Sequence, residues 1–156
     1  MEAVKTRTVK KFVLNAVREK SYKYETIAPL KSKKCVEDFL TQHFANEFYE
    51  HFVVIALDAS NRILGTTVLT GTTNMCSVYP KNVFAFLLVS GATSFIVAHN
   101  HPGGTLVASD ADWEITKKLY RIGDDMDIPL LDHILLTESG TTSLREAEKW
   151  NWVRFI

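Results

Sequence analysis

Cysteine is scarce in this sequence of 156 residues, which contains only Cys35 and Cys76. Two cysteines cannot build the disulfide framework on which small secreted domains depend, so we expect a reducing, cytoplasmic setting. Zinc deaminases need a His-x-Glu motif and a later Pro-Cys-x-x-Cys motif. Because neither motif occurs here, the sequence excludes that class of enzyme.

Net charge is also absent, because 18 lysines and arginines balance 18 aspartates and glutamates. The chain as a whole therefore has no electrostatic attraction for nucleic acid. The charges are unevenly distributed, since residues 1–34 carry ten basic and three acidic residues, a net charge of +7, which leaves −7 for the remainder. We interpret residues 1–29 as a basic N-terminal extension. A solvated surface is the more typical role of such a run, and weak binding to nucleic acid is the alternative.

Long hydrophobic runs are missing as well. Residues 82–109 contain no charged side chain, but Ser90 and Gly91 divide their apolar parts into segments 83–89 and 95–98. Each segment is much shorter than the roughly 20 apolar residues that a membrane-spanning helix needs. We therefore expect a buried helix followed by a buried strand, and no membrane partner.

Hydrophobic residues make up 46% of the chain and charged residues 23%, which is typical of a globular domain. Hydrophobic periodicity, capping residues and turn signals predict alternating helices and strands, and Gly123 is expected to end the third helix. The helices are expected over residues 32–44, 80–89, 109–121 and 142–148, and the strands over 52–57, 63–69, 95–99 and 129–137. With no repeats and no long linker, this order predicts one α/β domain, a single mixed β-sheet flanked by helices, over residues 30–156.

The residues with metal-binding chemistry follow the strand expected at 95–99. His99 and His101 project to the same side of an extended chain, and Asp112 lies in the first turn of the helix that Ser109 begins. Two imidazoles and one carboxylate leave the fourth position of a tetrahedral zinc ion open, as in catalytic zinc sites. The alternative is a purely structural role, in which Ser109 and Asp112 only cap the helix.

This pattern resembles the JAMM (MPN-plus) metalloprotease motif and, more closely, the RadC family of bacteria. The resemblance is carried by the segment from His99 to Pro102 with the later Ser109-x-x-Asp112, by residues 50–58, and by residues 131–133, and it covers about residues 30–150. It implies a JAMM/MPN-like fold with cytidine-deaminase-like topology. Gly103 departs from the family, which usually has serine there, and we expect altered loop packing rather than loss of the metal.

The resemblance also implies a role for each matching residue. His99, His101 and Asp112 would bind one Zn²⁺ per chain. Glu50 would transfer protons between the attacking water and the leaving amine, and Ser109 would hydrogen-bond the developing oxyanion.

The function that follows is hydrolysis of peptide or isopeptide bonds by a metal-activated water, with a protein or peptide as the substrate. Two alternatives stay open: a DNA-repair-associated or DNA-binding protein, which the missing helix-hairpin-helix region disfavours, and a non-catalytic scaffold. Glu47 is the alternative to Glu50 as the base. We interpret Asp132 and His133 as a structural pair rather than as a support for the metal.

Overall fold

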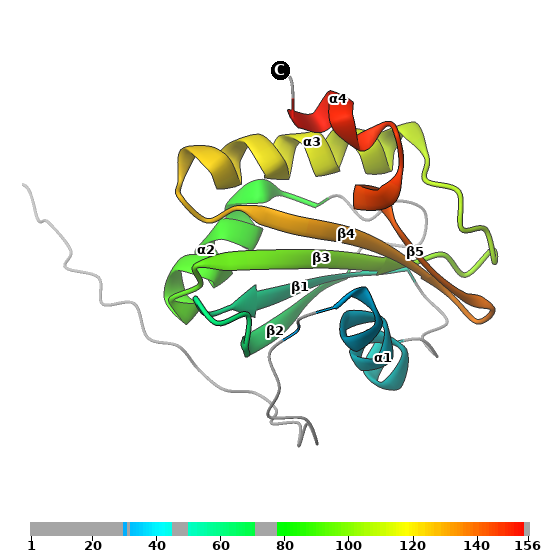
Figure 1. The fold of residues 1–156 in the computed structure, drawn as a ribbon, viewed down its shortest axis with the longest axis horizontal. Coiled ribbons are helices and arrows are strands. Elements are labelled where there is room, and N and C mark those ends of the chain that lie inside the picture. The colour runs from blue at the N-terminus through cyan, green and yellow to red at the C-terminus, as the bar shows by residue number, and fades with distance from the viewer. Residues whose placement is uncertain (1–29, 31, 45–49, 71–77, 155–156) are drawn as a thin grey trace, which may run out of the picture.

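A single mixed sheet of five strands forms the centre of the protein. The computed structural model describes residues 30, 32–44, 50–70 and 78–154, and its strands lie in the order β2-β1-β3-β4-β5 (Figure 1). Strands β3 and β4 are parallel, and the other neighbouring pairs are antiparallel. The strands are β1 (His51–Leu57), β2 (Ile63–Thr70), β3 (Ser94–Asn100), β4 (Leu130–Thr137) and β5 (Gly140–Ser143). The helices are α1 (Lys33–Phe44), α2 (Pro80–Ser90), α3 (Asp110–Asp125) and α4 (Trp150–Arg154), with a 3₁₀ helix, η1 (Leu144–Glu146).

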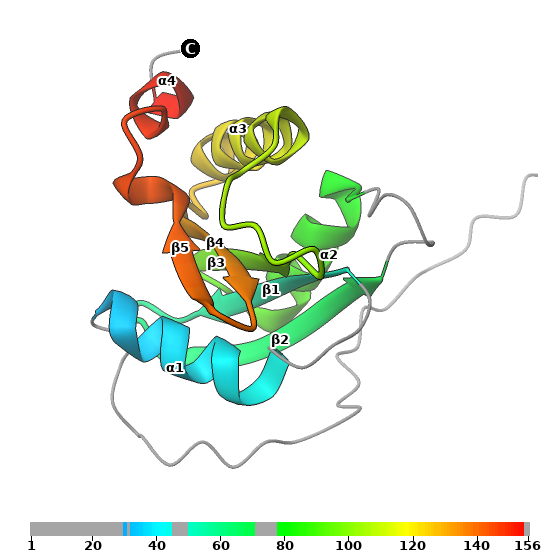
Figure 2. The same ribbon diagram turned by 90° about the vertical axis from the view of Figure 1, so that its right-hand side faces the viewer.

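Helices cover both faces of this sheet, which confirms the predicted α/β class. Helix α1 lies on one face, and α2 and α3 lie on the other, with α4 against α3 (Figures 1 and 2). Alternate residues of the central strands enter the two cores: Val54 and Val97 pack under α2 and α3, whereas Ile55 and Ile96 pack under α1. Burial on both faces explains why β1 and β3 have near-continuous apolar sequences.

The strand directions place the start of β1 and the end of β3 at the same edge of the sheet. Strand β1 runs antiparallel to β3 with Phe52 opposite His99, so β1 begins where β3 ends. The loop that follows β3 leads directly into the first turn of α3. A strand end, a loop and a helix N-terminus therefore meet, and this segment carries His99, His101 and Asp112.

Most of the predicted elements in the described residues are confirmed. Ser109 caps α3, and Gly91 ends α2 in the left-handed conformation at φ 69°, which glycine adopts without steric cost. The basic extension at residues 1–29 and the alternative base Glu47 lie outside the described residues. No helix in the described part of the chain combines the length and the apolar character needed to cross a membrane.

The expected stop of α3 at Gly123 is wrong, because the helix continues to Asp125. Gly123 is instead a point of close approach: a Cβ atom there would lie 2.6 Å from the carbonyl oxygen of Ile128 and 3.2 Å from the ring of Phe95. The backbone N–H of Ile128 also donates to the carbonyl of Gly123 at 2.8 Å. The glycine therefore lets the end of α3 pack directly on the chain that enters β4.

The predicted helix at 142–148 is also wrong in its boundaries. Thr142 and Ser143 belong to β5, where they pair with Leu135 and Ile134 of β4, and the helical segment is divided between η1 and α4. The edge of β4 that faces away from β3 pairs with this segment, and β-branched threonines suit a strand at that position.

We predict that Gly123→Ala lowers the free energy of unfolding by about 1–3 kcal/mol, the usual cost of overpacking, which outweighs the ~1 kcal/mol that alanine adds to a helix. Urea denaturation measures the change. Gly103→Ala is the control, because a Cβ there meets no atom within 4 Å. An unchanged or raised stability of Gly123→Ala would show that the helix end is not tightly packed.

Candidate metal centre

The two histidines of the motif face each other at the end of β3. His99 is the penultimate residue of the strand and only 2% exposed, and His101 follows the strand and is half-buried. Their Nε2 atoms lie 2.7 Å apart. The backbone N–H of His101 donates to the carbonyl of Leu136 on β4 at 2.8 Å, so the neighbouring strand holds the chain extended beyond β3. This geometry keeps both rings on one side, as the i, i+2 spacing predicts.

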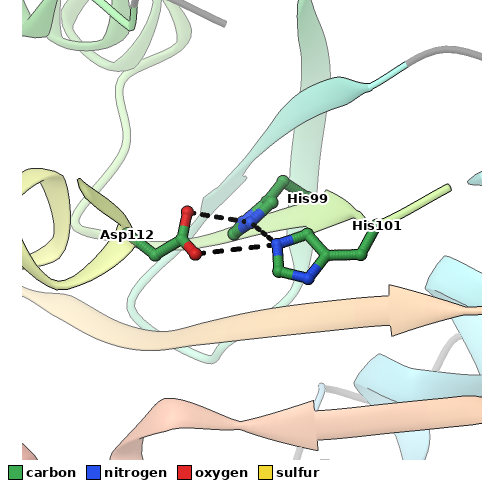
Figure 3. Close-up of side chains that lie close together, drawn as sticks. All are labelled: His99, His101 and Asp112. Carbon is green, nitrogen blue, oxygen red and sulfur yellow. Dashed lines mark hydrogen bonds and ion pairs between the residues drawn. The ribbon is translucent and has the colours of Figure 1, made fainter. Parts of the chain in front are cut away.

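Asp112 reaches the same point from the first turn of α3. Its Oδ1 atom lies 3.1 Å from Nε2 of His99, and its Oδ2 atom lies 3.6 Å from Nε2 of His101 (Figure 3). One donor atom from each of the three residues falls within 4.8 Å of the other two. The structure therefore brings together all three predicted ligands, on a strand end and a helix N-terminus.

Ser109 holds the Asp112 carboxylate in this position through a capping box. The backbone N–H and the hydroxyl of Ser109 both donate to Oδ2 of Asp112 at 2.7 Å, and the N–H of Asp112 donates to the Ser109 hydroxyl oxygen at 3.2 Å. Burial alone would raise the pKa of Asp112, but the interaction with His99 and the hydrogen bonds that Ser109 donates outweigh it and hold that pKa well below its usual value. The carboxylate is therefore charged over the whole physiological range.

The remaining ring nitrogen of His101 shows where its proton lies. Nδ1 of His101 is 2.8 Å from the carbonyl oxygen of Thr105. A carbonyl oxygen only accepts, so Nδ1 carries the hydrogen, and the Nε2 atom of the neutral ring is left with its lone pair. This lone pair faces the Nε2 atom of His99 and the Asp112 carboxylate, so either a hydrogen on Nε2 of His99 or a cation must lie among these atoms. Two imidazole nitrogens and a carboxylate are ligands that transition metals bind, so the residues present can hold a metal ion.

His133 contacts this centre, which the sequence interpretation did not favour. The backbone N–H of His133 donates to Asp132, but its fully buried ring lies 2.8 Å from Nδ1 of His99 and 2.6 Å from the hydroxyl of Thr116. The Asp132 carboxylate instead accepts hydrogen bonds from Ser143 and the backbone of Arg145. Asp132 thus contacts His133 only through the backbone N–H, and the side chain of His133 has His99 and Thr116 as its partners.

Thr116 is not among the residues that the sequence predicts for the site. It lies four residues after Asp112, which places it one turn along the same face of α3, and this spacing is the signal that points to it. The position of His133 depends on the pairing of β4 with β3, with Val97 opposite His133. No local sequence pattern reports that register.

Glu50 lies directly before β1, and its side chain is exposed. The ring of Phe52 stacks on His99 at 6.1 Å between centroids, so Phe52 and His99 share a face. Continuing their register by two residues brings Glu50 opposite His101 on that face. The backbone N–H of His51 donates to Oδ1 of Asn100 at 2.6 Å, which fixes the chain beside Glu50. The described cluster of three donors does not include Glu50.

The loop between β3 and α3 has room for a side chain at Gly103, where an added Cβ would meet no atom within 4 Å. A serine at this position fits without displacing a neighbour. The three donors lie together with glycine at this position.

Comparison with known proteins places this arrangement in a family. Residues 30–150, which contain the complete donor set, match the RadC-like JAB domain. The chain belongs to the RadC family. Its similar relatives include the UPF0758 proteins of Finegoldia magna, 39% identical over 114 residues, Trichodesmium erythraeum, 37% over 121 residues, and Trichormus variabilis, 39% over 125 residues.

These alignments cover 70%, 77% and 79% of this chain and 51%, 50% and 51% of the respective relatives. The chain thus spans about half the length of the curated relatives it matches. What this RadC-family chain shares with them is the domain that carries the candidate metal centre.

We predict that Ser109→Ala lowers the free energy of unfolding of the metal-free protein by about 0.5–2 kcal/mol, the cost of losing an N-cap. Ser109→Thr keeps a hydroxyl at the cap and is the matched control, expected to retain most of the stability. Urea titrations followed by circular dichroism measure both variants. Equal stability of Ser109→Ala and the unsubstituted protein would mean that the capping box does not hold α3.

Proposed function

We propose that this RadC-family chain is a zinc-dependent hydrolase that cleaves peptide or isopeptide bonds with an activated water. The observation that carries the proposal is the convergence of two imidazole Nε2 atoms and one carboxylate within 4.8 Å. Three protein ligands, with the fourth position open, are typical of catalytic zinc rather than structural zinc, which is usually enclosed by four protein ligands.

The zinc ion would lower the pKa of a water to about 7 and polarise the carbonyl of the scissile amide. The protein would supply the metal ligands, a proton carrier and a hydrogen-bond donor for the oxyanion. His99 and His101 are neutral ligands, and Asp112 adds one negative charge. Such a site needs no covalent intermediate with a protein nucleophile.

Glu50 is the proposed proton carrier. Its position directly before β1 supports this role, because continuing the register of Phe52 opposite His99 by two residues brings Glu50 opposite His101. A carboxylate at this position could accept a proton from the attacking water and deliver one to the leaving amine.

Ser109 is the proposed oxyanion donor. Its hydroxyl donates to Asp112 in this structure, so the role would require the hydroxyl to rotate toward the substrate. The backbone N–H of Ser109 would continue to hold the Asp112 carboxylate. Stabilisation of developing negative charge by such a donor contributes substantially to acyl transfer.

The substrate proposed is a protein or peptide. The names of the relatives state no reaction, so the assignment rests on the site.

Nucleic-acid binding by the basic residues 1–29 is the second candidate, favoured by the net charge of residues 1–34. Its salt dependence distinguishes it, because phosphate contacts weaken steeply as salt rises.

We predict one tightly bound zinc ion per chain in protein purified without chelators. His101→Ala removes one of three ligands and is expected to reduce the zinc content severely, whereas His51→Ala, a half-buried histidine of β1 outside the donor cluster, retains it. Elemental analysis by mass spectrometry measures the ratio. A zinc content near zero in the native protein would contradict the proposed metal.

We predict that Glu50→Gln keeps the fold and the zinc but loses about 10²–10⁴-fold in turnover, the usual contribution of a general acid–base group. The assay uses the fastest-cleaved substrate from a panel of peptides and isopeptides. Glu148→Gln, which changes an exposed glutamate between η1 and α4, is the matched control. Full activity of Glu50→Gln would reassign the base, and Glu47 is then the residue to substitute.

A further inference from the structure

A chain of buried hydrogen bonds links His99 back to the helix that supplies Asp112. It runs from Nδ1 of His99 to Nε2 of His133 at 2.8 Å, and from Nδ1 of His133 to Oγ1 of Thr116 at 2.6 Å. The Thr116 hydroxyl then contacts the backbone carbonyl oxygen of Asp112. His133 and Thr116 are fully buried, and His99 is 2% exposed, so water does not compete for these bonds.

The direction of every bond in this chain follows from its last acceptor. The Asp112 carbonyl oxygen can only accept, so the single hydroxyl proton of Thr116 is donated to it. Thr116 Oγ1 must then accept from His133, which means that Nδ1 of His133 carries a hydrogen.

The direction at the other end of the His133 ring follows from its burial. A charged ring fully removed from water and contacted at both nitrogens by uncharged groups is costly, so His133 is neutral and its Nε2 atom is an acceptor. His99 therefore donates from Nδ1. A neutral His99 ring is left with a bare Nε2 atom, and this is the atom that faces His101 and Asp112.

We propose that His133 and Thr116 are positioning residues that hold His99 in the one tautomer able to bind a metal ion through Nε2. The proposal rests on the metal site of the proposed function. Asp112 contributes twice, because its carboxylate is a ligand and its backbone carbonyl ends the chain that orients a second ligand. A metal-binding histidine is ordinarily oriented through its other ring nitrogen in this way.

Different groups thus hold His99 and His101 in the same tautomer, with the hydrogen on Nδ1. His101 donates from Nδ1 to a backbone carbonyl, that of Thr105, which no side-chain substitution removes. His99 lies deeper, and its partner is a side chain, His133, whose own tautomer depends on Thr116. The arrangement at His99 is therefore open to a test by substitution.

The first measurement is zinc affinity, by competition with a chromophoric chelator. Thr116→Val removes the hydroxyl with little change in shape, so His133 loses its acceptor and can place its hydrogen on Nε2, against His99. We expect zinc to bind about 10–100-fold more weakly, the usual effect of losing such a partner. Thr116→Ser restores a hydroxyl and is expected to stay within a few-fold of the unsubstituted protein.

Thr137→Val is the matched control, because Thr137 is also a buried threonine and its hydroxyl contacts are with Ser139 and Gly140 at the turn between β4 and β5. We expect its zinc affinity to be unchanged. A loss equal to that of Thr116→Val would show that any buried threonine matters, and would overturn the proposal. Unchanged affinity in Thr116→Val would overturn it as well.

The second measurement reads the tautomers directly, by ¹⁵N NMR of the histidine side chains in the metal-free protein at alkaline pH, where the rings are neutral. We expect His133 to carry its hydrogen on Nδ1 in the unsubstituted protein and on Nε2 in Thr116→Val. A hydrogen on Nε2 of His133 in the unsubstituted protein would overturn the proposal even if zinc binds. Failure of the unsubstituted protein to bind zinc would contradict the proposed function, while the NMR result would still decide the proton arrangement.

Discussion

The capping box between Ser109 and Asp112 is the interaction on which the candidate site depends. Two donors from Ser109 hold Oδ2 of Asp112 at 2.7 Å, and the N–H of Asp112 closes the box. The same contacts begin α3 and aim the Asp112 carboxylate at the end of β3. A local signal for starting a helix therefore also provides the ligand geometry. The capping of α3 and the proposed site roles of Ser109 and Asp112 therefore depend on the same set of contacts.

The sequence predicts well what is decided within a few residues of chain. Pro80 and Gly91 mark the two ends of α2, and alternating and continuous apolar runs mark β1 to β4. The spacing of His99 and His101 predicts their common side. Each of these features depends on local backbone geometry, which residue type and periodicity report directly.

What the sequence does not predict depends on contacts between distant segments. Gly123 carries the signal of a helix end, but tight packing against Ile128 explains it instead. The short edge strand β5 has no hydrophobic alternation of its own and forms because β4 offers it a partner. His133 reaches His99 only through the parallel register of β3 and β4, so its adjacency to Asp132 in sequence is misleading.

The central claim is that His99, His101 and Asp112 together bind one zinc ion. Anomalous diffraction from crystals of the protein as purified, recorded on both sides of the zinc absorption edge, tests it most directly. The account predicts one anomalous peak per chain, about 2.0–2.2 Å from Nε2 of each histidine and from an Asp112 oxygen. Absence of that peak, with the three side chains in contact only through hydrogen bonds and ion pairs, would contradict it.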